Sequence, residues 1–152
     1  MDKIAESILS TGLTTVYANT ESNSGVVTKE YGNRKFTATY NILCGIGSAS
    51  ITLINHYKLD ENGITERYGE TSATQLSFFG SISCDSQGTI TDKYATKPGG
   101  SNTNMYAQYY VTASSGGWNT NATAKIDSVL TYKKINKTKK TITLTQYSKK
   151  TY

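Results

Sequence analysis

The side chains that could do acid–base chemistry are few in this chain. Its one histidine, His56, lies in the stretch LINHYKL, and no recognisable nucleophile motif accompanies it. A catalytic triad requires a base, an orienting carboxylate and a nucleophile, and a zinc site usually requires several histidine or cysteine ligands. The sequence therefore predicts no cofactor, no metal site and no catalytic residue. Alternation places His56 at or near the surface.

Paired carboxylates are the remaining catalytic option, because glycoside hydrolysis needs only two acids at a set separation. Glu66 and Glu70 lie four residues apart, an even offset that predicts one shared strand face. Asp92 lies on a predicted neighbouring strand. The alternative is that these acids are solvated outer-face charges opposing Arg67 or Lys93. The sequence favours this alternative and a protein without enzymatic activity.

Positive charge is concentrated at the C-terminal end of the chain. Residues 1–127 contain nine Lys or Arg and eleven Asp or Glu, whereas residues 128–152 contain seven lysines and no acid. The candidate anion-binding residues are Lys133, Lys134, Lys137, Lys139 and Lys140, around a turn before the last predicted strand. Lys149 and Lys150 are expected on the tail. The competing interpretation is that the lysines protect a sheet edge and keep a hydroxyl-rich surface soluble.

The partners that such a surface favours are anionic wall polymers, acidic lipids and nucleic acid. Nucleic acid is the weakest of these, because the chain has two arginines and phosphate clamping and base readout favour the planar guanidinium fork. Lysines that bind an anionic polymer release its counterions, so any such contact should weaken steeply with salt.

Aromatic side chains provide a second candidate contact surface. Tyr106 and Tyr110 share the outward parity of one predicted strand, and Trp118 follows the turn SSGG. Flat rings beside amides suit stacking on sugars or docking on another protein. The alternative for Trp118 is that it closes one end of the core. A glycan or protein partner therefore stays open beside the anionic ligands.

Cys44 and Cys84 are the two cysteines, and each falls on the apolar parity of its predicted strand. Two inward cysteines of one core can meet, so we expect a disulfide, which stabilises by roughly 4 kcal/mol in the chain-entropy model. The alternative is a pair of buried free thiols. A disulfide indicates an oxidising compartment, which favours a secreted or cell-surface bacterial protein.

The elements that must position these residues are strands. The chain contains 24 Thr, 16 Ser and 12 Tyr, and apolar residues alternate with them between turn signals. The pattern predicts one all-β domain over residues 26–152, an antiparallel β-sandwich with a closed β-barrel as the alternative. About nine strands are expected: 26–31, 34–44, 48–59, 64–71, 75–84, 89–96, 105–113, 122–133 and 139–147. Tight hairpin turns are expected at 60–63 and 85–88, and a hairpin across INKT.

Residues 1–25 are expected to form an N-terminal extension. Val16-Tyr17-Ala18 matches the small-residue cleavage pattern of an exported protein's leader, although Glu6 and several hydroxyl residues make the preceding stretch weakly apolar. The alternative is a short helical turn followed by a linker. No run of 18 apolar residues occurs, so no transmembrane helix is predicted.

These observations predict a secreted or cell-surface binding protein that docks anionic polymers or membrane surfaces through its lysine-rich C-terminal hairpin. Three alternatives stay open. They are a membrane-active or antibacterial secreted protein, a small carbohydrate-active enzyme, and a structural subunit of an appendage or phage particle.

Overall fold

The computed structural model describes residues 20–44, 47–75, 81–115 and 118–152, with side chains described for 21–43, 47–74, 86–112 and 121–152. Every regular element in these ranges is a strand. The strands are β1 (Thr20–Glu30), β2 (Gly32–Cys44), β3 (Gly47–Asp60), β4 (Gly63–Gln75), β5 (Ser81–Asp92), β6 (Tyr94–Ala95), β7 (Ser101–Ser115), β8 (Trp118–Asn136) and β9 (Thr141–Thr151). No helix in this part of the chain is long and apolar enough to cross a membrane.

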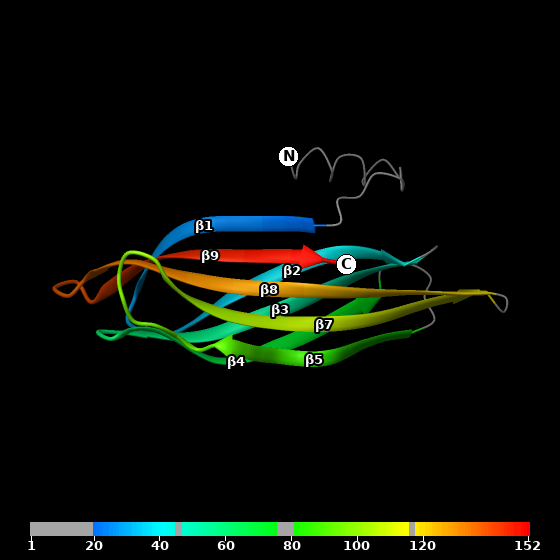
Figure 1. The fold of residues 1–152 in the computed structure, drawn as a ribbon, viewed down its shortest axis with the longest axis horizontal. Helices are drawn as coiled ribbons and strands as arrows, with labels where there is room; N and C mark the ends of the chain where they lie inside the picture. Colours follow the sequence, from blue (N-terminus) through cyan, green and yellow to red (C-terminus); the bar gives the residue numbers. More distant parts are fainter. Residues whose placement is uncertain (1–19, 45–46, 76–80, 116–117) are drawn as a thin grey trace.

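The strands form two antiparallel sheets that pack face to face (Figure 1). One sheet has the order β1-β9-β8-β7-β5, and the other has the order β2-β3-β4-β6. The predicted β-sandwich is confirmed, and the closed-barrel alternative is wrong. The chain passes between the sheets at Tyr31, where the Tyr31 amide donates to the carbonyl of Lys140, 2.9 Å away. This crossing ties the start of β2 to the β8–β9 hairpin.

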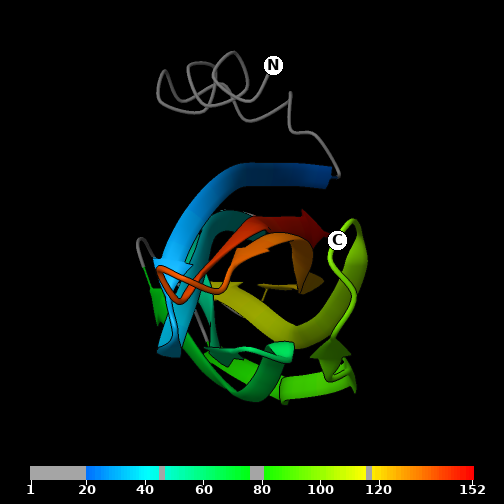
Figure 2. The same cartoon turned by 90° about the vertical axis from the view of Figure 1, so that its left-hand side faces the viewer.

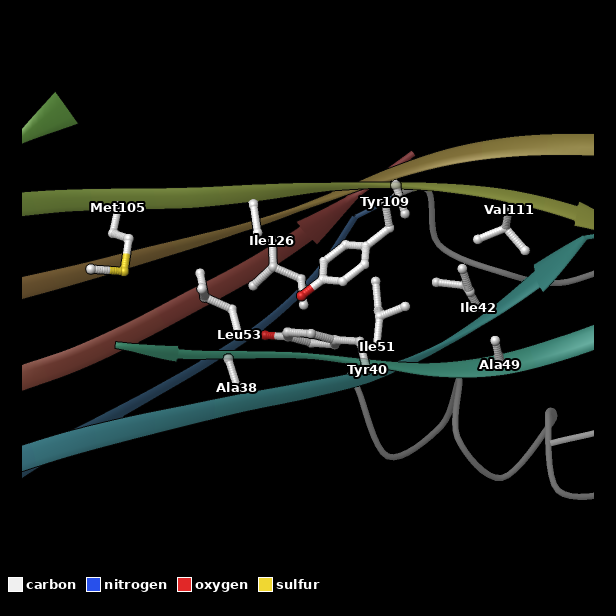
Figure 3. Close-up of a cluster of buried hydrophobic side chains, with 12 residues drawn as sticks. Ala38, Tyr40, Ile42, Ala49, Ile51, Leu53, Met105, Tyr109, Val111 and Ile126 are labelled. Atoms are coloured by element: carbon white, nitrogen blue, oxygen red, sulfur yellow. The ribbon is translucent and has the colours of Figure 1, made fainter. Parts of the chain in front are cut away.

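Alternation along the strands explains why the sandwich forms. In β3 each odd-numbered residue from Gly47 to Leu59 is buried while the residues between them are more exposed. The buried side chains of both sheets meet in the core, as the facing strands in Figure 3 show. One apolar cluster includes Leu53, Tyr109 and Ile126, and a second includes Leu59 and Leu144. Burial of this apolar surface is the main stabilising contribution to the fold.

The predicted hairpin turn at 85–88 is wrong, because β5 continues through it as one irregular strand. The pairing of β5 with β7 shifts register between Cys84 and Ser86 and again before Thr89. Gly88 has a φ of 49°, and a Cβ built on it would lie 2.4 Å from the Cα of Gly69. The glycine pair therefore lets β4 and β5 approach closely where the two sheets meet.

The N-terminal boundary also differs from the expectation. β1 begins at Thr20 and pairs along its whole length with β9, from Thr20 opposite Thr151 to Glu30 opposite Thr141. Residues 20–25, expected as linker, are thus the first half of an edge strand. Residues 1–19, including Val16-Tyr17-Ala18, lie outside the described residues, and the leader stays a prediction.

Candidate anion-binding site

The lysine-rich hairpin extends from one end of the sandwich. β8 and β9 remain paired up to Asn136 opposite Thr141, so the turn comprises residues 137–140, slightly later than predicted. The backbone amide of Lys139 donates to Oδ1 of Asn136 at 3.0 Å, and Lys140 adopts a φ of 55°. The side-chain acceptor closes the turn locally, as Asn commonly does. Figure 2 faces this end and shows the orange turn beside the bend of β1 in blue.

All five predicted anion-binding lysines are exposed at this end: Lys133, Lys134, Lys137, Lys139 and Lys140. None of them makes an ion pair with another described residue. Their clustering therefore creates a positive potential at this end, which no carboxylate of the described side chains neutralises through an ion pair. Glu30 is the acid opposite Thr141 in the β1–β9 register, and it is exposed.

Three of these lysines line a surface depression of about 470 Å³, which we call the hairpin depression. Its lining is Thr28, Lys134, Ile135, Asn136, Lys137, Lys139, Thr141 and Thr143. The hydroxyls of Thr28 and Thr143 lie 2.8 Å apart. One hydroxyl hydrogen satisfies this contact and the other stays free to donate, so the depression offers a neutral donor beside three ammonium groups. The sequence indicated the lysines but not β1, which contributes Thr28 from more than a hundred residues away.

A second cationic depression, of about 450 Å³, lies beside the first crossing between the sheets. We call it the β1–β2 depression; its lining is Lys29, Asn33, Arg34, Lys35 and His56. Sequence reasoning missed this site, because it depends on an edge strand of each sheet. The available signal was the group of Lys29, Arg34 and Lys35 around the turn Gly32-Asn33.

Arg34 has a structural role within the β1–β2 depression. Its Nε donates to the carbonyl of Glu30 at 3.0 Å, and its Nη2 donates to the carbonyl of Tyr31 at 3.3 Å. These bonds satisfy backbone acceptors where the chain leaves one sheet for the other. The charge of the guanidinium contributes to the depression, but two of its donors are already engaged.

His56 lies near the surface, as expected, with 16% of its side chain exposed. Its ring stacks on Tyr68 with centroids 4.2 Å apart and planes 16° apart. Nε2 lies 2.5 Å from Oε1 of Glu70. The imidazole is thus held in a cross-strand contact that stabilises the outer face of the sheet.

The expectation that Glu66 and Glu70 share a strand face is wrong. Tyr57 pairs with Glu66, whereas the preceding residue His56 pairs with Tyr68, so Arg67 is an extra residue in β4. Such a β-bulge reverses the parity of every following side chain. Glu66 is consequently buried and Glu70 is exposed. The expected carboxylate pair does not form.

Glu66 lies in a polar layer inside the sandwich. Asn55, Thr103 and Ser128 are the other buried polar side chains nearby, and Nδ2 of Asn55 donates to Oγ of Ser128 at 2.9 Å. Within the described part of the chain, neither Glu66 carboxyl oxygen has a hydrogen-bond partner of ordinary geometry. Burial raises the pKa of Glu66 to about 7, which Thr103 and Asn55 partly oppose. An acid enclosed in this way cannot reach a polysaccharide, so Glu66 cannot act as one of the two carboxylates of a glycoside hydrolase.

Asp92, the third acid considered, is exposed at the end of β5. Its negative charge raises the pKa of Glu66 further, as the smallest of the contributing effects. Across the described residues no group of three or more His, Cys, Asp or Glu side chains could hold a metal ion.

Lys150 is not on the tail as expected but fully buried on the inner face of β9. Its Nζ lies 3.5 Å from Oε2 of Glu21 and 4.5 Å from the ring centroid of Tyr152. Burial lowers the pKa of Lys150, and Glu21 partly restores it. Lys150 has the same strand parity as Ile142, so both side chains point inward. The sequence did not predict this because the expected strand ended at Tyr147, before Lys150.

The predicted aromatic surface lies on the outer face of β7. Tyr110 is 39% exposed, and Nζ of Lys125 lies 4.7 Å from the ring centroid of Tyr106. Trp118 begins β8, but its side chain lies outside the described residues, as do those of Cys44 and Cys84. A sugar or protein contact here, and the disulfide, stay predictions.

The fold and the surface define a class, an antiparallel β-sandwich domain with two cationic depressions at one end. No known protein family, no curated protein and no solved structure matches the chain. The geometry of this end is therefore the basis for inferring a function.

Proposed function

We propose that the protein is a non-enzymatic binding protein of the cell exterior that docks anionic polymers or anionic surfaces through the β8–β9 hairpin. The observation that carries the proposal is the cluster of five exposed lysines around the hairpin depression, none of which makes an ion pair with another described residue. Lysines that only protect a sheet edge do not require a concave surface with hydroxyl donors among them. The buried position of Glu66 supports a binding role over glycoside hydrolysis.

The test is binding of the intact protein to purified bacterial cell wall, anionic liposomes and heparin over a salt series. We expect the logarithm of the binding constant to fall linearly with the logarithm of the salt concentration, because ammonium groups displace counterions from the polymer. Changing Lys133, Lys134, Lys137, Lys139 and Lys140 to Gln should abolish it. The result that contradicts the proposal is equal binding by this variant, or no binding by the wild type at low salt.

A matched pair of variants separates location from net charge. Lys137→Gln/Lys139→Gln removes two charges from the hairpin depression, and Lys125→Gln/Lys149→Gln removes two from the outer face of the same sheet. Only the Lys137/Lys139 substitutions should weaken binding and make the binding constant less dependent on salt concentration. An equal effect of both pairs indicates general charge attraction without a site. Dye leakage from the same liposomes tests the membrane-active alternative.

The proposal includes secretion and the predicted Cys44–Cys84 disulfide. β2 carries Cys44 in the four-stranded sheet and β5 carries Cys84 in the five-stranded sheet, so the bond would link the two sheets. Alkylation of the unfolded protein before and after reduction, followed by mass spectrometry, counts the free thiols. Two thiols blocked only after reduction support the bond, and two blocked without reduction contradict it.

A further inference from the structure

The two cationic depressions lie on opposite sides of one strand. Thr28 lines the hairpin depression, and the next residue, Lys29, lines the β1–β2 depression. Successive side chains of a strand point to opposite faces. β1 is an edge strand of the five-stranded sheet, so it presents an open border around which a ligand can pass.

The linings of the two depressions match in charge. Lys134, Lys137 and Lys139 line the first, and Lys29, Arg34 and Lys35 line the second. An asparagine amide lines each surface, and threonine hydroxyls line the hairpin depression alone. No described carboxylate lines either one. Each depression therefore suits one or more anionic groups with several acceptor oxygens.

The side chains favour phosphate groups over nucleobases. Two donors of Arg34 are engaged by the carbonyls of Glu30 and Tyr31, and His56 is stacked on Tyr68. Neither depression thus offers an unoccupied ring for stacking or a free guanidinium fork for base recognition. The remaining cations are lysines, which bind phosphate as point charges.

We propose that a flexible linear polymer bearing phosphate groups wraps around β1 and places successive phosphates in the hairpin depression and the β1–β2 depression. This inference rests on the proposed function and names its ligand class. A flat bilayer can approach one side of a strand at a time, whereas a flexible chain can occupy both sides. One chain in two weak sites gains affinity, because the second contact becomes intramolecular.

Calorimetric titration of the intact protein with linear polyphosphates of graded length, beginning with inorganic phosphate, tests the inference. We expect affinity to rise with length until one chain spans both depressions. Lys29→Gln/Lys35→Gln and Lys137→Gln/Lys139→Gln should each lower affinity for long chains by on the order of tenfold and remove the length dependence. Lys125→Gln/Lys149→Gln should leave the affinity for long chains and its dependence on length unchanged.

The outcomes separate this inference from the proposed function. If the Lys29/Lys35 variant binds long chains like the wild type while the Lys137/Lys139 variant does not, the wrapping is refuted and the hairpin site stands. If no anionic polymer binds at low salt, the wrapping inference and the proposed function are both refuted. Stronger binding of polygalacturonate than of polyphosphate overturns the preference for phosphate. Binding to phosphatidylglycerol vesicles that is weakened equally by the Lys29/Lys35 and the Lys137/Lys139 changes overturns the wrapping geometry.

Discussion

Glu66 faces the core of the sandwich, whereas Glu70, four residues later on the same strand, faces solvent. The extra residue Arg67 separates the two orientations. The bulge therefore has a chemical consequence, because it places one carboxyl group in a layer where its charged form is poorly solvated.

The first prediction is that Glu66 makes the protein less stable as the pH rises. Its folded-state pKa is about 7 against an ordinary value of 4.5. Between these values the folded protein holds a proton that the unfolded chain has released, so the free energy of unfolding falls as pH rises. The contribution is complete below pH 4.5 and is lost as pH passes 7, a change of roughly 3 kcal/mol.

Glu66→Gln should remove this dependence, because the amide has the shape of the carboxyl group and no charge. Urea unfolding from pH 4 to pH 8 measures it. The variant and the wild type should be similar at pH 4, and the variant should be more stable at pH 8. Glu61→Gln, at an exposed position in the turn between β3 and β4, is the control. Parallel wild-type and Glu66→Gln profiles would show that Glu66 does not titrate in this range.

The sequence could predict the all-β sandwich, because alternation gives the inner face of regular strands such as β3. It could not predict features that depend on tertiary contacts. Asp85-Ser86-Gln87-Gly88 has the composition of a turn, but β5 continues through it with shifted register, and Gly88 lies against Gly69 of β4. The candidate site was half predictable for the same reason: the lysines are adjacent in sequence, while Thr28 and Lys29 arrive through the pairing of β1 with β9.

The second prediction concerns the close approach of β4 and β5. Gly69→Ala or Gly88→Ala places a methyl group within 2.4 Å of the opposite Cα, and at Gly88 it also strains a left-handed backbone. Each variant should lose about 1–3 kcal/mol of stability or more, measured by urea unfolding. Gly25→Ala is the control, since a Cβ there contacts nothing within 4 Å. Equal stability of all three variants would mean that the two strands can separate freely.

The third prediction concerns the buried pair of Glu21 and Lys150. Glu21→Gln leaves the buried ammonium without its partner carboxylate and should destabilise by about 3 kcal/mol at neutral pH. Lys150→Met fills the same space without charge and should cost much less. The double variant should resemble Lys150→Met alone, because the remaining polar group at position 21 is partly exposed. Thermal unfolding of the three variants forms the double-mutant cycle, and additive effects would show that the two residues do not interact.

The fourth prediction separates the two roles of Arg34. Arg34→Lys keeps the positive charge of the β1–β2 depression but loses the geometry that joins Nε and Nη2 to the carbonyls of Glu30 and Tyr31. The variant should lose about 1 kcal/mol of stability. Its polyphosphate affinity, measured well below its unfolding temperature, should stay within about twofold of the wild type, because charge dominates such contacts. Arg34→Gln should lower both quantities. A large loss of affinity in Arg34→Lys, with stability unchanged, would instead assign the guanidinium a direct bidentate contact with phosphate.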